Sequence, residues 1–381
     1  MICEPVTRRR FLDRCARCAL GGLAAGSGLA LGRDASAAVG NVSNVQAQYW
    51  HVVRGQETQC DLCPRACRIK PGERGFCGAR ENANGKYVTR VYGKPCAKGQ
   101  DPMEKGPFYH YLPKTTTLAL GTAGCNLDCL YCQSAEFAQA RPEQTDNVNL
   151  PPAELAAQVA KYGLRTITFT FSEPLQCVEY VIDTAREAHQ RGVKVLFHSA
   201  GYARPGPFRD LCHAVDAINI DLKGFSEDFY RANTGGQLAP VLESLQTAAA
   251  SGKHLEVTNL VVPGYNDDLN MVAQMCCWIR DNLGPETPVH FSRFFPKYKM
   301  QQVPPTAITT LEEVRQAAYK AGIRYAYVGN VPGHGGESTY CPKCNAMLVK
   351  HVGYQSITYE ALNQKTGKCV ACGLKIPGVW R

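Results

Sequence analysis

Three cysteines in one short loop form the part of this sequence best suited to chemistry. Cys125, Cys129 and Cys132 lie in "GCNLDCLYC", separated by three and then two residues. Thiolates at this spacing can bind one metal ion or one metal cluster. A closed tetrahedral metal site has four protein ligands, and this loop supplies three. Either the fourth ligand comes from elsewhere in the chain, or the position is left open for a reaction.

Two further cysteine groups flank this loop in a chain that has 19 cysteines. The first comprises Cys60, Cys63, Cys67 and Cys77. The second comprises Cys341, Cys344, Cys369 and Cys372. A long chain with an odd cysteine count and C-x-x-C spacings favours metal ligation over a disulfide scaffold. The first group predicts either structural zinc or an auxiliary iron–sulfur cluster that could relay electrons. The second has zinc-ribbon spacing and predicts zinc, with an iron–sulfur centre or disulfides as alternatives.

Strands and helices that alternate from residue 114 to 330 must position the three-cysteine loop. Short apolar runs predict strands at 115–122, 165–171, 193–199, 217–222, 255–263, 288–295 and 324–330. Amphipathic stretches between them predict helices at 151–163, 178–192, 208–215, 239–252, 269–284 and 311–322. This order predicts an α/β fold with a parallel sheet, as a partial or full β/α barrel or an open doubly wound sheet. In a barrel the loop after the first strand lies at the catalytic end.

Composition divides the chain into four predicted segments. Residues 1–40 form a leader, 41–113 a cysteine-rich segment of loops held by metal, 114–330 the barrel and 331–381 a zinc-ribbon-like module. In the leader, "RRRFL" and an apolar stretch predict a twin-arginine export signal to the periplasm. A disordered basic extension, or a start codon assigned too early, is the alternative. No later segment has the apolar length that a membrane span needs.

The overall charge is modest and excludes few partners on its own. The chain has 381 residues, a net charge of +9, 45% hydrophobic and 20% charged residues, typical of a globular protein. It has no run of five like charges and no basic stripe with interleaved aromatic residues. We therefore expect no nucleic-acid partner.

The three-cysteine loop, with Tyr131 before its last cysteine, resembles the signature of the radical S-adenosylmethionine (SAM) superfamily. The resemblance implies that Cys125, Cys129 and Cys132 hold three irons of a [4Fe-4S] cluster. The fourth iron would bind S-adenosyl-L-methionine, with Tyr131 among the cofactor-binding residues. One electron would cleave this cofactor, and the resulting 5′-deoxyadenosyl radical would abstract hydrogen from a substrate.

Other positions resemble the activase-like branch of that superfamily. "FTFSEP" places Ser172 and Glu173 where the cofactor's amino group is held, although the two glycines common before this Glu are absent. Ser199 in "FHSAGY" would lie near the methionyl or ribose part. In "INIDLKGF", Lys223 would approach the carboxylate and Asp221 would orient it or face the substrate as a catalytic residue. A helix-capping role for Glu173 and a structural salt bridge between Asp221 and Lys223 are the alternatives.

A later strand carries two further candidates. His290 and Arg293 in "VHFSRFF" would face the site if the strand register is right. A buried core histidine is the alternative for His290.

Motifs on both sides of the predicted barrel indicate a resemblance to one family within this superfamily. "CDLCPRACRIKPGERGFCGAR", "NVPGHGGESTYCPKC" and "GKCVACGLKIPGVW" resemble the AmmeMemoRadiSam system radical SAM enzyme family, related to pyruvate formate-lyase activating enzymes. The resemblance covers residues 50–381. It implies Memo-like and AMMECR-type proteins as partners, and the chemistry implies an electron donor such as a flavodoxin or ferredoxin.

The sequence thus predicts a radical enzyme acting on an unidentified substrate. The alternative in the same class is a glycyl-radical-enzyme activase, which does not need the terminal ribbon. The alternative in another class is a non-catalytic iron–sulfur or zinc-ribbon protein, which explains neither the barrel nor Glu173 and Lys223. The predicted leader conflicts with the chemistry, because S-adenosylmethionine and a low-potential reductant are expected in the cytoplasm.

Overall fold

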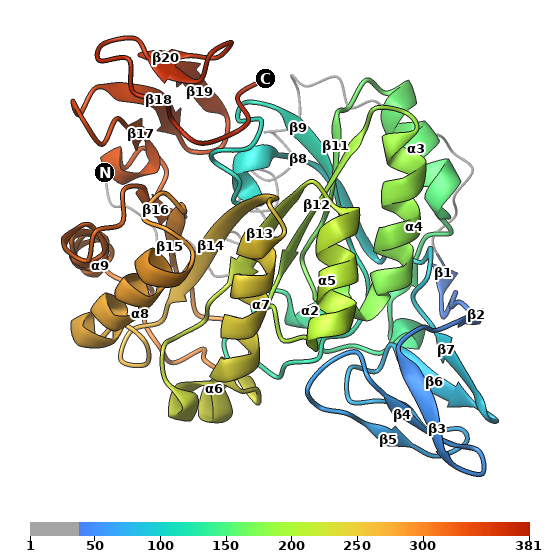
Figure 1. Ribbon diagram of the computed structural model, residues 1–381. Helices are drawn as coiled ribbons and strands as arrows, with labels where there is room; N and C mark the ends of the chain where they lie inside the picture. The colour runs from blue at the N-terminus through green and yellow to red at the C-terminus, as the bar shows by residue number, and fades with distance from the viewer. Residues whose placement is uncertain (1–37) are drawn as a thin grey trace, which may run out of the picture. The chain divides into compact units, whose positions relative to one another are not determined.

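A computed structural model describes residues 38–381 of the protein. An eight-stranded sheet lies at its centre (Figure 1). Its order is β16-β15-β14-β13-β12-β11-β9-β8, and the first seven strands are parallel. These are β9 (Thr116–Gly121), β11 (Thr166–Phe169), β12 (Lys194–Ser199), β13 (Ala217–Asp221), β14 (His254–Val261), β15 (Val289–Arg293) and β16 (Ala326–Gly329). Strand pairing does not continue from β16 to β8, so the barrel is not closed. The prediction of an α/β fold with a partial barrel is confirmed.

Helices follow the parallel strands and cover one side of the sheet (Figure 1). They are α3 (Pro152–Lys161), α4 (Val178–His189), α5 (Pro205–Ala214), α7 (Leu238–Ala250), α8 (Leu269–Asn282) and α9 (Ile308–Lys320). Each has an apolar face for the sheet; α4, for example, buries Val178, Val181 and Ala185. None of the helices in residues 38–381 is long and apolar enough to cross a membrane.

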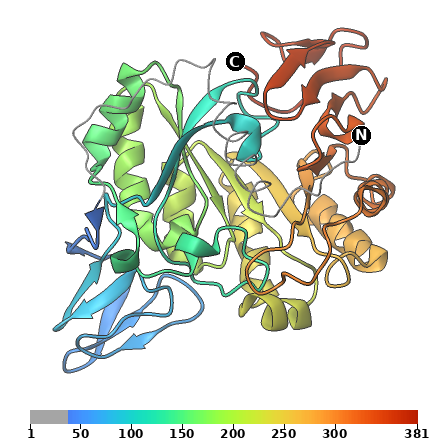
Figure 2. The same ribbon diagram turned by 180° about the vertical axis from the view of Figure 1, so that it is seen from behind.

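Two elements of this region differ from the sequence-based expectation. Helix α6 (Glu227–Thr234) occupies a stretch expected to be loop, with Ser226 accepting from the Phe229 amide at 3.0 Å and Gly235 ending it at φ 63°. Strand β8 (Ala97–Pro102) lies in the cysteine-rich segment, yet it pairs antiparallel with β9 at the edge of the main sheet. Its sequence "AKGQDP" is polar and contains Lys and Pro, which are common in edge strands (the strand is teal in Figure 2).

The cysteine-rich segment contains small sheets where only loops were expected. One three-stranded sheet has the order β3-β4-β5 and another β2-β7-β6, both antiparallel. The strands are β2 (Val45–Gln46), β3 (Trp50–Arg54), β4 (Glu57–Cys60), β5 (Arg68–Ile69), β6 (Arg80–Ala83) and β7 (Lys86–Thr89). Strand β1 (Ala38–Val39) pairs with β10 (Asp146–Asn147). The predicted twin-arginine leader lies outside the described residues, apart from its last positions.

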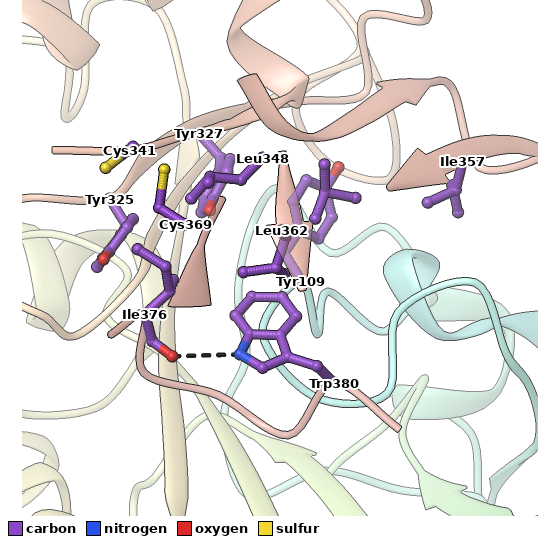
Figure 3. Packing of buried hydrophobic residues seen from close by; sticks show 11 residues of the cluster. Tyr109, Tyr325, Tyr327, Cys341, Leu348, Ile357, Leu362, Cys369, Ile376 and Trp380 are labelled. Atoms are coloured by element: carbon purple, nitrogen blue, oxygen red, sulfur yellow. Dashed lines mark hydrogen bonds between the residues drawn. The ribbon is translucent and has the colours of Figure 1, made fainter. Parts of the chain in front are cut away.

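The C-terminal module packs beside β16 through a shared apolar cluster (Figure 3). Its strands are β17 (Thr339–Tyr340), β18 (Met347–Val352), β19 (Ser356–Tyr359), β20 (Leu362–Asn363) and β21 (Lys368–Cys369). Trp380 donates from Nε1 to the Ile376 carbonyl at 3.2 Å and belongs to the same cluster as Leu348 and Tyr327 of β16. The cluster also contains Cys341 and Cys369, so the cysteine knuckles are tied to the core of the module.

Residues 107–112 run across the open side of the partial barrel. Asn219 of β13 donates to the Pro107 carbonyl at 2.8 Å, and Glu256 of β14 accepts from the Tyr109 and His110 amides. The Leu112 amide also donates to the Val379 carbonyl at 2.6 Å. This segment therefore packs against the middle strands β13 and β14 and joins them to the C-terminal residues.

Candidate active site

The loop with Cys125, Cys129 and Cys132 leaves the end of β9 and leads into α2 (Ala135–Ala138). The last turn of α6 fixes its backbone, because the Thr234 and Asn233 carbonyls accept from the Asp128 amide at 2.8 Å and the Leu130 amide at 2.9 Å. Sequence reasoning missed this support, although Ser226 and Gly235 are the capping residues that mark such a helix.

Gln176 supports the other end of this loop. It lies in the short helix η3 (Pro174–Cys177) and donates to the Ala123 carbonyl at 3.2 Å and to the Gly124 carbonyl. The loop is thus held between η3 and α6. Its cysteines are positioned by backbone contacts before any ligand binds.

A cavity of about 410 Å³ brings the predicted catalytic and cofactor-binding residues together. Those that line it are Cys125, Cys129, Tyr131, Cys132, Ser172, Glu173, Ser199, Asp221 and Lys223. They come from the carboxyl ends of β9, β11, β12 and β13, where parallel strands of a barrel present their functional residues. The N-terminal and C-terminal cysteine groups do not line this cavity.

Glu173 is buried and holds the ends of two strands together. Its Oε1 accepts from the Leu175 amide at 2.9 Å and the Ser199 hydroxyl at 2.7 Å, and its Oε2 accepts from the Ala200 amide at 2.8 Å. Burial raises the pKa of this carboxyl, against the opposing effect of these hydrogen bonds and of Lys223. A carboxylate offers about four lone-pair positions, so these three bonds leave one position on Oε2 available, and Glu173 lines the cavity.

Ser172 makes a neighbouring contact that shapes the loop. Its hydroxyl donates to the Thr122 carbonyl at 2.6 Å, which joins the end of β11 to the cysteine loop. Phe171 precedes it with φ 68°, in the left-handed region that a bulky residue rarely adopts. The turn places Ser172 and Glu173 side by side on the cavity wall.

Asp221 and Lys223 form an ion pair that extends to a histidine. Asp221 accepts from Lys223 Nζ at 3.0 Å through Oδ2 and contacts His198 Nε2 at 2.8 Å through Oδ1. Burial favours the neutral carboxyl, but Lys223 and His198 outweigh it and lower the pKa of Asp221. Burial also opposes the charge on Lys223, and Asp221 with Cys129 raises its pKa instead. His198 was missed, although it directly precedes Ser199 at the end of β12.

Three more polar residues line the cavity, namely Glu104, His290 and Tyr354 of the C-terminal module, and they are called its polar end below. His290 contacts Glu256 through Nε2 at 2.6 Å, so it both faces the cavity and belongs to a buried network. Burial raises the pKa of Glu104 to about 7, while the Lys114 amide opposes this shift.

The expectation that Arg293 faces the site is wrong. Side chains of a strand alternate between its two faces, and His290 and Ser292 are those that line the cavity. Arg293 instead donates from Nε to the Thr306 carbonyl at 2.8 Å.

The C-terminal cysteines form a separate and much tighter group. Cys341 Sγ lies 3.5 Å from Cys372 Sγ, and Cys344 Sγ lies 3.7 Å from Cys369 Sγ. Within residues 38–381, this is the one group of three or more Cys, His, Asp or Glu side chains whose ligand atoms all lie within 4.8 Å of one another. The group could hold a metal ion.

Comparison with known proteins identifies the family. The radical SAM superfamily model matches residues 120–276, which include the cysteine loop and the strands up to β14. The uncharacterized protein MJ0808 of Methanocaldococcus jannaschii is 41% identical over 331 residues, covering 87% of this chain and 98% of that protein. This chain belongs to the radical SAM superfamily.

More distant relatives match part of this radical SAM protein. A GTP 3′,8-cyclase of Corynebacterium glutamicum is 33% identical over 165 residues, covering 41% of this chain and 44% of the cyclase. A solved domain of the pyruvate-formate lyase-activating enzyme from Bacteroides vulgatus aligns with a TM-score of 0.38 at 16% identity. That alignment covers 43% of this chain and 98% of the domain.

Radical SAM membership implies a [4Fe-4S] cluster and S-adenosylmethionine, and the residues of the cavity fit them. The three cysteine sulfurs are not within 4.8 Å of one another, as they would be around a single ion, and a cubane carries its thiolates on separate irons. Burial raises the pKa of the Cys129 thiol to about 12, so a metal is needed to keep it as a thiolate. The buried Tyr131 hydroxyl has no hydrogen-bond partner among the described residues.

Proposed function

We propose that this protein is a radical SAM enzyme that abstracts hydrogen from a substrate held at the polar end of the cavity. The observation that carries the proposal is the shared cavity itself. Three cysteines, a buried carboxylate with a free acceptor position and an ion-paired lysine line the same space. When bound, the cluster and S-adenosylmethionine supply the 5′-deoxyadenosyl radical.

The chain's own residues bind and orient the cofactor. Cys125, Cys129 and Cys132 hold the cluster. Glu173 accepts a hydrogen bond from the amino group through Oε2, and Lys223 donates to the carboxylate. These contacts use an anion and a cation that are already fixed by their protein partners, so little side-chain entropy is lost on binding.

The remaining predicted residues position Glu173, Lys223 and the cysteine loop, or complete the wall of the cavity. Asp221 holds Lys223 in place, and Ser199 orients Glu173. Ser172 fixes the turn beside the cysteine loop, and Tyr131 covers the cluster with its ring. Glu104 and His290 face the substrate end, where each could bind a polar group.

We propose zinc for the C-terminal group of Cys341, Cys344, Cys369 and Cys372. A Zn–S bond of about 2.3 Å in a tetrahedron places the sulfurs about 3.8 Å apart. The distances of 3.5 and 3.7 Å match this value. Because the module contributes Tyr354 to the cavity, the zinc would stabilise part of the substrate end.

The finer assignments also belong to the proposal. The flanking motifs support membership of the AmmeMemoRadiSam family, with Memo-like and AMMECR-type proteins as partners. We keep the four segments 1–40, 41–113, 114–330 and 331–381, with β8 shared between the second and third. A flavodoxin or ferredoxin would supply the electron, and a functional twin-arginine leader would direct export.

Anaerobic reconstitution followed by reduction in the presence of S-adenosylmethionine tests the central proposal. Wild-type protein is expected to release 5′-deoxyadenosine and methionine, and Cys129→Ala is expected to release neither and to contain less iron. Cys277→Ser, on α8 and outside the cavity, is the matched control. If wild type forms no 5′-deoxyadenosine and Cys129→Ala keeps its full iron content, the function is wrong.

A further inference from the structure

The N-terminal cysteines converge on one enclosed cavity of their own. Cys60 ends β4, Cys63 and Cys67 lie in the following turn, and Cys77 precedes β6. The Cys60 amide donates to the Cys67 carbonyl at 2.9 Å, and the Phe76 amide donates to Cys67 Sγ at 3.5 Å. All four cysteines line the cavity, together with Arg65, Arg80 and Tyr87. Four thiols from two loops thus face one small space.

The distances between these sulfurs distinguish a site for an iron–sulfur cluster from a site for a single metal ion. The C-terminal cysteines of the same chain lie at zinc distances, whereas no three of the N-terminal cysteines fall within 4.8 Å of one another in the described part of the chain. Around one zinc ion the sulfurs would be about 3.8 Å apart. The N-terminal group therefore resembles Cys125, Cys129 and Cys132, which also have the wider spacing.

Two further side chains suit an anionic cluster with sulfide atoms. The Tyr87 hydroxyl is fully buried in this cavity close to the Cys60 thiol and has no other hydrogen-bond partner within the residues that the structure describes, so it can donate to sulfur. The Arg65 guanidinium donates only to the carbonyls of Asn126 and Gly235 and has no ion pair in residues 38–381. Its charge is available to offset the negative charge that iron–sulfur clusters carry on thiolate ligands.

The N-terminal group also touches the loop of the candidate active site. The Cys77 carbonyl packs directly on Gly124, where a Cβ atom would lie 2.2 Å from that oxygen. Cys77 and Cys125 line the same surface groove, and Arg65 Nε donates to the Asn126 carbonyl at 2.6 Å. A cluster on Cys77 would therefore be separated from the cysteine loop by a single backbone contact.

We propose that Cys60, Cys63, Cys67 and Cys77 bind a [4Fe-4S] cluster that passes electrons to the cluster on Cys125, Cys129 and Cys132. This proposal rests on the proposed radical SAM function, because that function requires the second cluster, which accepts the electron. A low-potential one-electron carrier loses one electron, and the N-terminal cluster goes from its 2+ to its 1+ state. It returns to 2+ when the electron moves to the second cluster, and no covalent bond changes in the relay.

The surface beside this group fits an acidic carrier protein. Phe76 is 50% exposed, and the Arg65 guanidinium lies 3.4 Å above the centre of its ring. The exposed Arg231 lines the same surface hollow as Arg65 and Phe76. Positive charge around an exposed ring favours docking of a negatively charged partner and speeds the encounter.

Metal analysis tests the site without relying on catalysis. The variant Cys125→Ala/Cys129→Ala/Cys132→Ala, purified and reconstituted anaerobically as the full chain, is expected to keep about four irons and four sulfides. Its reduced cluster should give an electron paramagnetic resonance signal that S-adenosylmethionine does not change. If this variant contains zinc at two sites and no iron, the proposed cluster is wrong. If it keeps the cluster but wild type cleaves no S-adenosylmethionine, only the proposed function fails.

Comparison of reductants tests the relay. Cys77→Ser is expected to lose at least about tenfold in S-adenosylmethionine cleavage driven by flavodoxin and less than about threefold with dithionite, a small reductant that needs no docking surface to reduce the second cluster. Equal loss with both reductants, with the second cluster still loaded, contradicts the relay.

If Cys77→Ser does not fold, Tyr87→Phe tests the N-terminal cluster through its reduction potential. Loss of a hydrogen bond to sulfur should lower the N-terminal cluster's reduction potential, and an unchanged potential contradicts the assignment. Cys277→Ser should behave as wild type throughout.

Discussion

Replacement of Glu173 by Gln separates its structural role from its proposed role in binding S-adenosylmethionine. The carboxylate accepts three hydrogen bonds, two at Oε1 and one at Oε2. Gln keeps one oxygen and the two bonds to it, but its NH2 group would face the Ala200 amide, which is also a donor. Loss of a charge-assisted bond costs about 1.5–3 kcal/mol, and relief of a buried charge offsets part of this. We expect the free energy of unfolding to fall by about 1–2 kcal/mol.

The effect on the cofactor should be larger than the effect on the fold. The amino group would lose its anionic acceptor, again about 1.5–3 kcal/mol, which corresponds to roughly 10- to 150-fold weaker binding. Equilibrium dialysis of labelled S-adenosylmethionine against anaerobic, cluster-loaded protein measures this directly. Iron content should not change, because Glu173 is not a cluster ligand.

Ser199→Ala provides the matched control for this experiment. It removes one donor to the same carboxylate, leaves the charge in place, and should weaken S-adenosylmethionine binding by less than about fivefold. If Glu173→Gln binds the cofactor within about twofold of wild type at equal iron content, Glu173 is only a cap of η3 and the reasoning is refuted.

Three further perturbations test other parts of the structure. The pKa of Glu104 is raised by burial from 4.5 to about 7, so folding favours the protonated form and stability should fall by about 3 kcal/mol as pH rises from 4.5 to above 7. Glu104→Gln should flatten this dependence in urea unfolding at pH 5 and pH 8, and an unchanged slope would contradict the assignment. Asp221→Asn leaves Lys223 without its carboxylate and should cost about 1–3 kcal/mol in chemical denaturation; Asp221→Asn/Lys223→Met should recover part of that loss, and no recovery would argue against the pair. Cys344→Ser should remove zinc, lower the thermal midpoint and leave the iron content unchanged, whereas loss of iron instead would place a cluster in the ribbon.

Elements with a strong periodic pattern could be predicted from the sequence, and those defined by tertiary contacts could not. The seven parallel strands and the helices after them follow from apolar runs and amphipathic faces. Strand β8 has a polar sequence and exists because β9 offers it an unpaired edge. Helix α6 is short, and its caps at Ser226 and Gly235 were the available signal.

The candidate site shows the same division. Cys125, Glu173 and Lys223 could be predicted because each lies in a motif at a strand end. Asn233 and Gln176 carry no motif, since they act through a backbone carbonyl and a side-chain amide that support the loop. Arg293 was assigned to the site from its neighbourhood in sequence, and strand alternation places it on the opposite face from His290.

The C-terminal module contributes Tyr354 to the cavity wall. Glu104 and His351, the latter on β18, approach to 3.9 Å, and both are buried. Burial lowers the pKa of His351 to about 4 and raises that of Glu104 to about 7, so between these values both groups are neutral. The contact between Glu104 and His351 therefore adds no charge beside the cavity in this pH range, and neither His351 nitrogen has a hydrogen-bond partner within residues 38–381. Glu104 lines the cavity, and its Oε2 has no hydrogen-bond partner within residues 38–381. We therefore expect a polar, uncharged substrate group to suit Glu104 better than an anion, because it brings a hydrogen bond without a further buried negative charge.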